Sequence, residues 1–196
     1  MKILTGVPAE RLNDIPSLAQ AAEHNGFSGL STQENRHNPF LPLAIAAVHS
    51  QQLELRTNVA IAFARSPMVA AGLAWDLQYA TAGRFVLGLG SQVKGHNQRR
   101  FSVPWSPPAP RLREYIEAIQ AIWVCWRDGT PLQYEGKHYQ FSLMTPNFTP
   151  EPLTSALPKL HIAAVGPAMM KVAASACDGV MLHAFCTPKY LTESIL

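Results

Sequence analysis

Residues 53–92 carry one strand–helix–strand pattern, and this pattern restricts the fold more than any other part of the sequence. Residues 55–62 are β-rich without polar alternation, as in a parallel strand that is covered on both faces. Ser66-Pro67 supplies an N-cap and a proline at the first helical position, and Gly83 closes the helix before a second apolar strand at residues 85–89. The unit predicts an α/β protein with a parallel sheet.

The same alternation continues along the chain. Strands are expected at residues 2–6, 29–32, 55–62, 85–89, 159–164 and 179–183, and helices at 15–25, 39–51, 67–79, 111–126 and 167–177, with a further helix after Thr187-Pro188. Right-handed crossovers place consecutive parallel strands side by side, so we expect sequential strand order. The pattern predicts a (β/α)8 TIM-barrel type fold with about six of the eight βα units, forming a single incomplete domain over residues 1–196.

Residues 128–158 interrupt this alternation. A short hairpin is expected near Gly136, followed by a loop with Pro146 and Pro150. We interpret the segment as an insertion within the domain and not as a domain boundary.

Composition and charge exclude several function classes. No apolar run reaches the roughly 20 residues that span a bilayer, and the N-terminus is too short for a secretory signal, so a cytoplasmic protein without membrane contact is expected. The net charge of +3 is too small to indicate nucleic acid. Cys125, Cys177 and Cys186 follow no disulfide or metal spacing and are interpreted as reduced core thiols, and the scattered histidines predict no metal site.

A basic run without any Asp or Glu begins just before the strand that ends at Gly90 and continues beyond it. It contains Arg84, Lys94, Arg99, Arg100, Arg111 and Arg113. Charge alone favours a solvated surface loop. The other interpretation is attraction of an anionic ligand such as a phosphate.

Ligand sites in α/β proteins lie at the carboxyl ends of parallel strands, so residues 58–62 and 88–92 should open on one face. At the fifth strand end, Gly166 permits close backbone approach, and Pro167 begins a helix whose N–H groups suit a phosphate, although a simple turn explains the same pair. A polar cluster, Gln33, Glu34, Asn35 and His37, follows the second strand. His183 ends the sixth strand and faces either this mouth or the core.

Dispersed motifs resemble the luciferase-like monooxygenase superfamily, in particular its branch that uses the deazaflavin coenzyme F420. The resemblance rests on their shared order and spacing. They are Ala21-Ala22-Glu23 with Gly26-Phe27, Asn38-Pro39-Phe40-Leu41-Pro42-Leu43, Thr57-Asn58-Val59, Arg65-Ser66-Pro67, residues 83–92, Tyr134-Glu135-Gly136, Val165-Gly166-Pro167 and Asp178-Gly179-Val180.

The resemblance implies a site. It places a bulge with a non-prolyl cis peptide at Asn58–Val59 beneath the cofactor ring, although residue properties alone favour an ordinary buried strand. It makes Glu34 the candidate catalytic residue. The expected cofactor-binding residues are Asn58, Val59, Ala60, Gly90, Ser91, Gln92, Ala164, Val165, Gly166, Pro167 and His183, with residues 164–167 holding the phosphate.

The resemblance also implies a function. We expect hydride transfer or O2 activation on a small organic substrate, with coenzyme F420 or alternatively FMN as cofactor. A homodimer through the helix at 111–126 or 67–79 is expected. The alternative is a non-catalytic flavin-binding or dimerisation module.

Members of the superfamily continue through two more βα units that close the barrel. The first and sixth strands should therefore have unpaired edges, and the open barrel should expose apolar faces. A fragment of a longer enzyme, a degraded gene and a short form completed by a partner chain are all compatible with the sequence.

Overall fold

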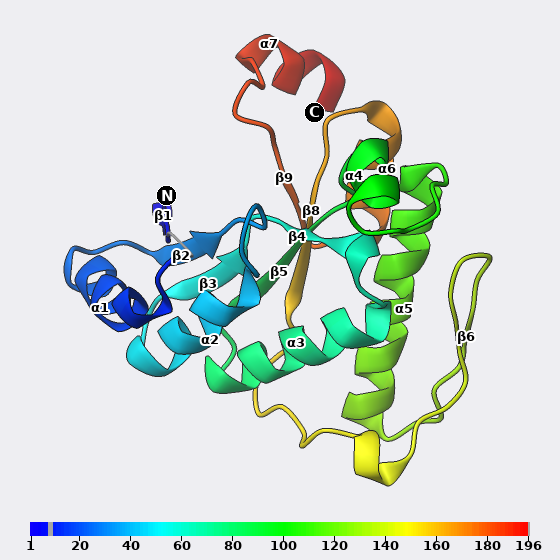
Figure 1. Ribbon diagram of the computed structural model, residues 1–196, viewed down its shortest axis with the longest axis horizontal. Helices are drawn as coiled ribbons and strands as arrows, with labels where there is room; N and C mark the ends of the chain where they lie inside the picture. Colours follow the sequence, from blue (N-terminus) through cyan, green and yellow to red (C-terminus); the bar gives the residue numbers. More distant parts are fainter. Residues whose placement is uncertain (8–9, 196) are drawn as a thin grey trace.

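The computed structural model describes residues 1–7 and 10–195 and contains one curled parallel sheet that forms a half-barrel (Figure 1). Its strands follow one another in sequence order, as predicted. They are β1 (Leu4–Gly6), β2 (Gly29–Thr32), β3 (Glu54–Thr57), β5 (Phe85–Gly90), β8 (Lys159–Ala163) and β9 (Gly179–Met181), with β4 (Ala60–Ile61) also paired to β5. The predicted strand at residues 55–62 is thus divided into β3 and β4.

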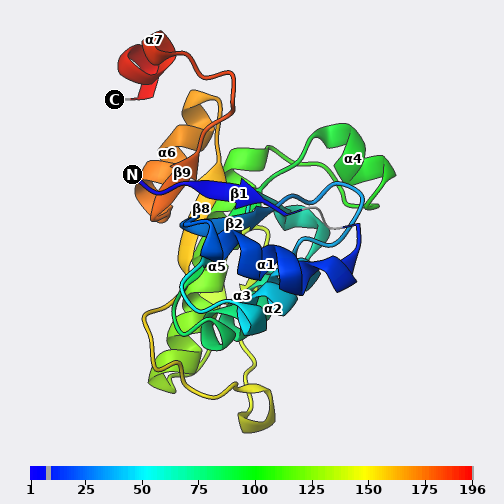
Figure 2. The ribbon, with the colours of Figure 1, turned by 90° about the vertical axis from the view of Figure 1, so that its left-hand side faces the viewer.

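The longer helices connect these strands and cover one face of the sheet (Figures 1 and 2). They are α1 (Ile15–His24), α2 (Phe40–His49), α3 (Pro67–Ala80), α5 (Pro108–Asp128) and α6 (Pro167–Ala176). The short helix α4 (Lys94–Arg99) lies in the loop after β5, and α7 (Pro188–Tyr190), which continues as a π-helical turn at Leu191–Ile195, follows β9 and stands apart from the sheet. Short 3-10 turns lie at Leu12–Asp14, Ala62–Ala64 and Pro146–Phe148. The Ser66 hydroxyl accepts the Val69 amide at 3.2 Å, so the predicted N-cap of α3 is confirmed.

The helices differ from the prediction in two places: one helix was not expected, and another begins earlier than expected. The basic run contains helix α4, which has no apolar periodicity because Asn97 is its only buried residue. Helix α5 begins at Pro108 and not at Arg111, since prolines fit a first helical turn where their missing N–H would have no partner.

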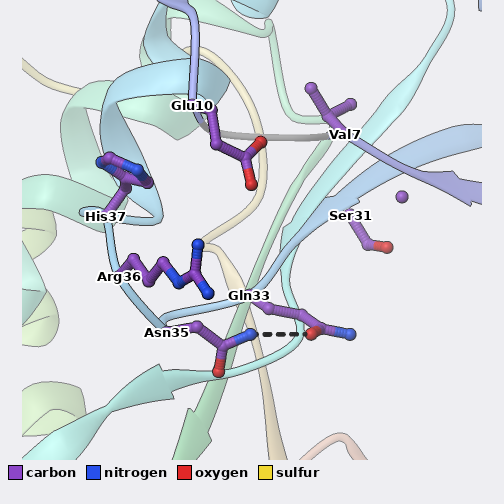
Figure 3. A pocket seen from close by; sticks show the side chains of 8 residues that line it. Val7, Glu10, Ser31, Gln33, Asn35, Arg36 and His37 are labelled. Carbon is purple, nitrogen blue, oxygen red and sulfur yellow. Dashed lines mark hydrogen bonds between the residues drawn. The ribbon is translucent and has the colours of Figure 1, made fainter.

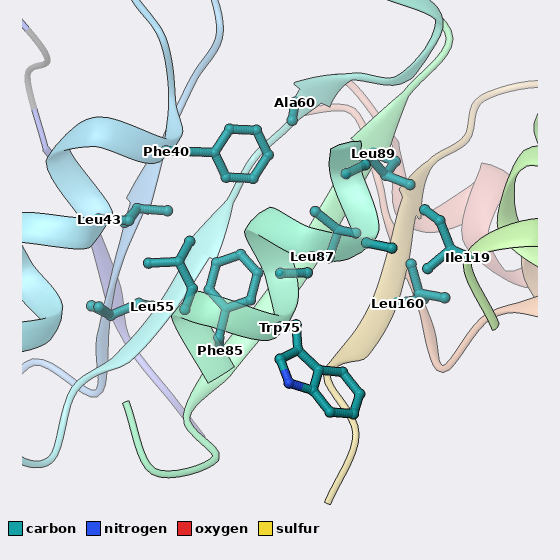
Figure 4. Packing of buried hydrophobic residues seen from close by; sticks show 14 of the residues in the cluster. Phe40, Leu43, Leu55, Ala60, Trp75, Phe85, Leu87, Leu89, Ile119 and Leu160 are labelled. Atoms are coloured by element: carbon teal, nitrogen blue, oxygen red, sulfur yellow. The ribbon is translucent and has the colours of Figure 1, made fainter. Parts of the chain in front are cut away.

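The hydrophobic core lies between the sheet and the helices (Figure 4). Leu55, Phe85 and Leu87 project from the strands toward this side and are fully or almost fully buried. Trp75 of α3 is buried among them and donates its indole N–H to the Glu151 carbonyl at 3.0 Å. Apolar burial of this extent is the main stabilising contribution to the half-barrel.

The segment after α5 forms the predicted hairpin, with β6 (Tyr134–Glu135) antiparallel to β7 (Gln140–Phe141). It packs on α5, because the Tyr139 ring meets the Tyr115 ring edge to face with centroids 5.5 Å apart. Leu132 is buried at the start of the segment.

The two end strands of the sheet have one neighbour each. Among the described residues, β1 pairs with β2 alone and β9 with β8 alone, which confirms the expected open edges. The expectation of exposed apolar faces does not hold for the central row of the face opposite the helices, although Leu4 and Met181 on the same face are partly exposed. The central row consists of Ser31, Arg56, Val86 and Lys159, of which only Val86 is apolar, and it is buried.

Cys125 is buried, Cys177 and Cys186 are partly buried, and all three are free thiols. Burial, with a smaller effect of the Asp178 charge, raises the pKa of the Cys177 thiol to about 12. Among the residues described, no helix combines the length and apolar character needed to cross a bilayer.

Candidate functional site

The carboxyl ends of the strands surround a cavity of about 660 Å³. Residues from β2, β3, β5, β8 and β9 or from the loops after them meet there, as the strand-end rule predicts. The lining consists of Gln33, Glu34, Asn35, Asn58, Val59, Ile61, Gly90, Ser91, Gln92, Val93, Ala163, Val165, Gly166, Met169 and His183.

A β-bulge forms one wall of this cavity. Strand β3 pairs Leu55 with Phe85, whereas β4 pairs Ala60 with Leu89, so five steps along one strand oppose four along the other. The extra residue lies at the Asn58–Val59 peptide, which is cis, as predicted. A bulge of this kind redirects side chains next to a site, and here Asn58 and Val59 line the cavity.

Two glycines of β5 make room for the bulge. A β-carbon on Gly88 would lie 1.9 Å from the Thr57 carbonyl oxygen, and one on Gly90 would lie 2.7 Å from Cγ2 of Val59. The Thr57 hydroxyl donates to the Gly88 carbonyl at 2.7 Å and accepts the Gly88 amide at 2.9 Å. The segment 88–90 is therefore glycine-rich because the bulge packs directly on it.

Glu34 and Arg65 fasten the bulge from the other side. The Arg65 guanidinium donates to both carboxylate oxygens of Glu34 at 2.7 Å, and the Ile61 amide donates to the same carboxylate at 2.7 Å. The Glu34 amide donates to the Val59 carbonyl at 3.3 Å. Only 9% of the Glu34 side chain and 14% of the Arg65 side chain are exposed, so this is a largely buried bidentate ion pair.

The geometry supports a positioning role for Glu34. All three hydrogen bonds that its carboxylate accepts hold the chain around the bulge, and a catalytic role stays a prediction. Arg65 belongs to one of the motifs that carry the family resemblance. Its contact with Glu34, 31 positions away, is visible only in the fold.

The predicted phosphate loop follows β8, which lies on the other side of β5 from the bulge. Val165 and Gly166 line the cavity, whereas Ala164 is buried in the core and Pro167 stands outside the lining. The Met169 amide donates to the Gly166 carbonyl at 3.0 Å because α6 begins with a tight turn, so this amide is not free for a phosphate. Among the described residues, Ala168 is the first amide of α6 without an acceptor.

Some of the remaining predicted residues line the cavity and others lie outside its lining. Ser91, Gln92 and His183 line the cavity, and Ala60 is buried behind it. His183 is exposed, so its alternative position in the core is wrong. Its Nδ1 accepts the Phe185 amide at 3.2 Å. The cofactor roles of all these residues stay predictions.

Asn97 supports the cavity rim and was missed by sequence reasoning. It is fully buried, and its Nδ2 donates to the carbonyls of Ser91 at 3.0 Å and Val93 at 3.2 Å. Helix α4 thereby fixes the loop after β5. Arg100, at the end of α4, donates to the Asn35 carbonyl at 2.7 Å and joins this loop to the one after β2.

A smaller, polar pocket of about 340 Å³ adjoins the main cavity (Figure 3). It shares Gln33 and Asn35 with the main cavity. The side-chain Nδ2 of Asn35 donates to the side-chain Oε1 of Gln33 at 3.2 Å. The remaining lining is Gly6, Val7, Glu10, Ser31, Arg36 and His37. Within the described chain, no three His, Cys, Asp or Glu side chains group as metal ligands.

A parallel half-barrel with a large cavity at its strand ends defines an α/β-barrel protein with one ligand-binding face. The sequence profile described as luciferase-like monooxygenase matches residues 2–195, and the chain belongs to this family.

Known proteins that resemble the chain fall into the same family or fold. An uncharacterized protein of Mycobacterium tuberculosis is 48% identical over 190 residues, which cover 97% of this chain and 56% of the relative. An F420-dependent secondary alcohol dehydrogenase, solved with an F420-acetone adduct, superposes with a TM-score of 0.77 at 17% identity, covering 100% of this chain and 62% of that one.

A type II Baeyer-Villiger monooxygenase component from a plasmid of Pseudomonas putida, solved with FMN, gives a TM-score of 0.71 at 16% identity. That match covers 88% of this chain and 54% of the monooxygenase component. The chain spans about half the length of the curated relatives it matches.

Proposed function

We propose that this chain carries the cofactor-binding part of an oxidoreductase that uses coenzyme F420, with FMN as the alternative cofactor, and acts on a small organic substrate. The observation that carries the proposal is the bulge, held between Gly88, Gly90 and the Glu34–Arg65 pair, at the wall of a cavity of about 660 Å³. This volume lies within the range of about 300–1,000 Å³ that is usual for small-molecule sites.

The residues present fit a planar ring that carries a phosphate chain. Val59 and Ile61 offer an apolar wall for one ring face. In the loop after β8, Gly166 is exposed and a β-carbon there would meet nothing within 4 Å, so backbone approach is unhindered. The amide of Ala168 and the positive end of the α6 dipole suit a phosphate.

The chemistry that a bound deazaflavin or flavin supplies is hydride transfer, and a flavin also reacts with O2. The chain's own residues then orient the ring and exclude water. Glu34 and Arg65 contribute by keeping the bulge in place, since their charges neutralise each other and leave the wall close to uncharged.

Titration of the purified chain with F420 and with FMN tests the proposal. We expect Gly166→Val to weaken binding of the preferred cofactor at least tenfold, because branched carbons would fill the approach to the backbone. Gly166 has φ of −94°, so valine is compatible with the fold.

Gly72→Ala is the matched control, because Gly72 on α3 also has open space around its β-carbon position and lies outside the cavity lining. Unchanged affinity in Gly166→Val would remove the loop after β8 from the site. Failure of both cofactors to bind the unmodified chain would overturn the proposal.

A second candidate is a non-catalytic flavin-binding or dimerisation module. The exposed apolar side chains of Val69 and Tyr79 on α3 favour it, because they could form a contact between two copies. Exchange of hydride between the bound, chemically reduced cofactor and a panel of small ketones separates the two functions. A cofactor that binds tightly and exchanges with none supports the module.

A further inference from the structure

Gln92 has a backbone conformation that residues with a side chain rarely adopt. It follows the end of β5 with φ of 56°, in the left-handed region that favours glycine. A β-carbon costs free energy in this region, so such residues persist where the surrounding structure enforces them, and they concentrate at ligand sites. Gln92 is also one of the residues that line the main cavity. A long polar side chain at this position therefore calls for a function that glycine could not perform.

The side chain of Asn97 holds Gln92 in this conformation. Its Nδ2 donates to the carbonyls on either side of Gln92, to Ser91 at 3.0 Å and to Val93 at 3.2 Å. The backbone amide of Asn97 donates to the same Val93 carbonyl at 3.1 Å. Asn97 is fully buried, so water does not compete for these bonds. All of these contacts lie within residues 91–97, and the conformation of Gln92 is therefore set locally.

The side-chain amide of Gln92 has a defined orientation. Its Oε1 accepts the Val93 backbone N–H at 2.9 Å, and only the oxygen of a side-chain amide can accept this bond. The positions of oxygen and nitrogen in the amide are thereby fixed. Nε2 carries two N–H donors and meets no acceptor among the described residues. The chain thus holds an oriented hydrogen-bond donor at the cavity.

This donor follows directly on the contact between β5 and the bulge. Gly90, two residues before Gln92, pairs with Ile61 of β4, and a β-carbon on Gly90 would lie 2.7 Å from Cγ2 of Val59. Val59, Ile61 and Gln92 line the same cavity. A molecule that packs on the apolar wall of Val59 and Ile61 is therefore within the space that the Gln92 amide borders.

We propose that Gln92 determines specificity by donating a hydrogen bond from Nε2 to a carbonyl oxygen of the molecule in the cavity. The inference rests on the proposed function, since it names a contact for the ligand of that site. A carbonyl oxygen is an acceptor only, and it matches a group that donates only. The ring of a flavin or deazaflavin and a ketone substrate both carry such an oxygen.

Gln92→Glu tests this contact, because it keeps the length of the side chain and an oxygen for the Val93 amide but replaces the donor with an acceptor. Two titrations are needed, one with FMN and F420 and one in which cyclohexanone is added to the cofactor-loaded chain. We expect one of them to be weaker by about tenfold. A loss in the first assigns the carbonyl to the ring, and a loss in the second alone assigns it to the substrate.

Two controls separate the donor from the added charge. Gln98→Glu makes the same change at an exposed position of α4 outside the cavity lining and should leave both titrations unchanged. Gln92→Met removes the donor without adding a charge and should weaken the same titration as Gln92→Glu. For a ring contact, the infrared band of the ring carbonyls in bound FMN should lie at lower wavenumber in the unmodified chain than in Gln92→Met.

Gln92→Gly separates binding from folding. Glycine adopts φ of 56° readily, so the midpoint of denaturant unfolding should not fall, whereas the affinity that depends on Gln92 should. Ser102→Gly is the matched control. Ser102 is also left-handed, with φ of 55°, but it is exposed and lies outside the cavity lining, so its variant should keep full affinity.

The outcomes that would contradict the proposal differ from those that would contradict the proposed function. Both titrations unchanged in Gln92→Glu, or a Gln92→Gly chain with a lower unfolding midpoint and full affinity, would overturn this proposal alone and give Gln92 a structural role. Failure of the unmodified chain to bind either cofactor would overturn the proposed function and this inference with it.

Discussion

At the scale of single residues, Gly88 controls whether the bulge can form. A β-carbon at this position would overlap the Thr57 carbonyl oxygen at 1.9 Å, and backbone cannot move aside as a flexible side chain can. We expect Gly88→Ala to lower the free energy of unfolding by about 2–3 kcal/mol, as overpacking typically does. Denaturant titration measures this. Gly166→Ala, where the β-carbon meets nothing, should change stability by no more than about 0.5 kcal/mol.

Glu34 provides the second residue-scale prediction. Replacing one partner of a largely buried ion pair leaves the other charge unpaired, so Glu34→Gln should cost about 3 kcal/mol of stability. Glu117→Gln removes the carboxylate charge of a more exposed pair with Arg113 and should cost less than about 1 kcal/mol. A Glu34→Gln protein of full stability that binds cofactor but has lost turnover would instead make Glu34 catalytic.

Glu54 makes stability depend on pH. Burial opposes its ionisation, but hydrogen bonds from Lys2 and Arg56 outweigh this and lower its pKa below the ordinary 4.5. A carboxyl group with a lowered folded-state pKa stabilises the fold above its unfolded pKa, and this contribution is lost as the pH falls through the folded value. Urea titrations from about pH 7 to about pH 3 should show a shallower loss in Glu54→Gln than in the unmodified chain.

Sequence reasoning found residues whose position follows from a strand end, and missed those whose role depends on a distant partner. Asn58, Val59 and Gly166 line the cavity as expected, the first two through the resemblance. Arg65 and Asn97 were missed, because an ion pair across 31 residues and a buried amide in a basic helix leave no local pattern.

At the scale of elements, the strand–helix alternation predicted the order of the sheet, because periodicity records which side of an element is buried. The division between β3 and β4 was not predicted as a boundary. It depends on Gly88 and Gly90 of β5, which have no side chains and so leave room for the bulge. Helix α4 was missed because one buried residue in six gives no periodic signal.

The segment 128–158, interpreted as an insertion, is packed into the fold at its hairpin. Tyr139 stacks edge to face on Tyr115, and its hydroxyl accepts the Arg111 Nε–H at 3.1 Å. We expect Tyr139→Ala to lower the free energy of unfolding by about 2 kcal/mol or more, measured by denaturant titration. Lys137→Ala, exposed in the same hairpin, should be neutral, and equal effects of the two variants would contradict this account.

At the scale of the whole molecule, we expect a homodimer through the outer helices. Val69 and Tyr79 of α3 are 52% and 60% exposed, which is consistent with an apolar interface there. Light scattering after gel filtration should give twice the mass of the chain, and Tyr79→Glu should give the single mass. Val48→Glu, on α2, is the control for an added charge at an exposed apolar position. A monomer at all concentrations would contradict the expectation.

The bulge also determines how this family's sequences should vary. Its geometry depends on Gly88 and Gly90, on the ion pair of Glu34 with Arg65, and on the extra residue itself, which come from separate parts of the chain. None of these features is useful without the others. Across related sequences, these positions should therefore change together, so that a homologue with a larger residue at position 88 also has a continuous third strand and no carboxylate at position 34.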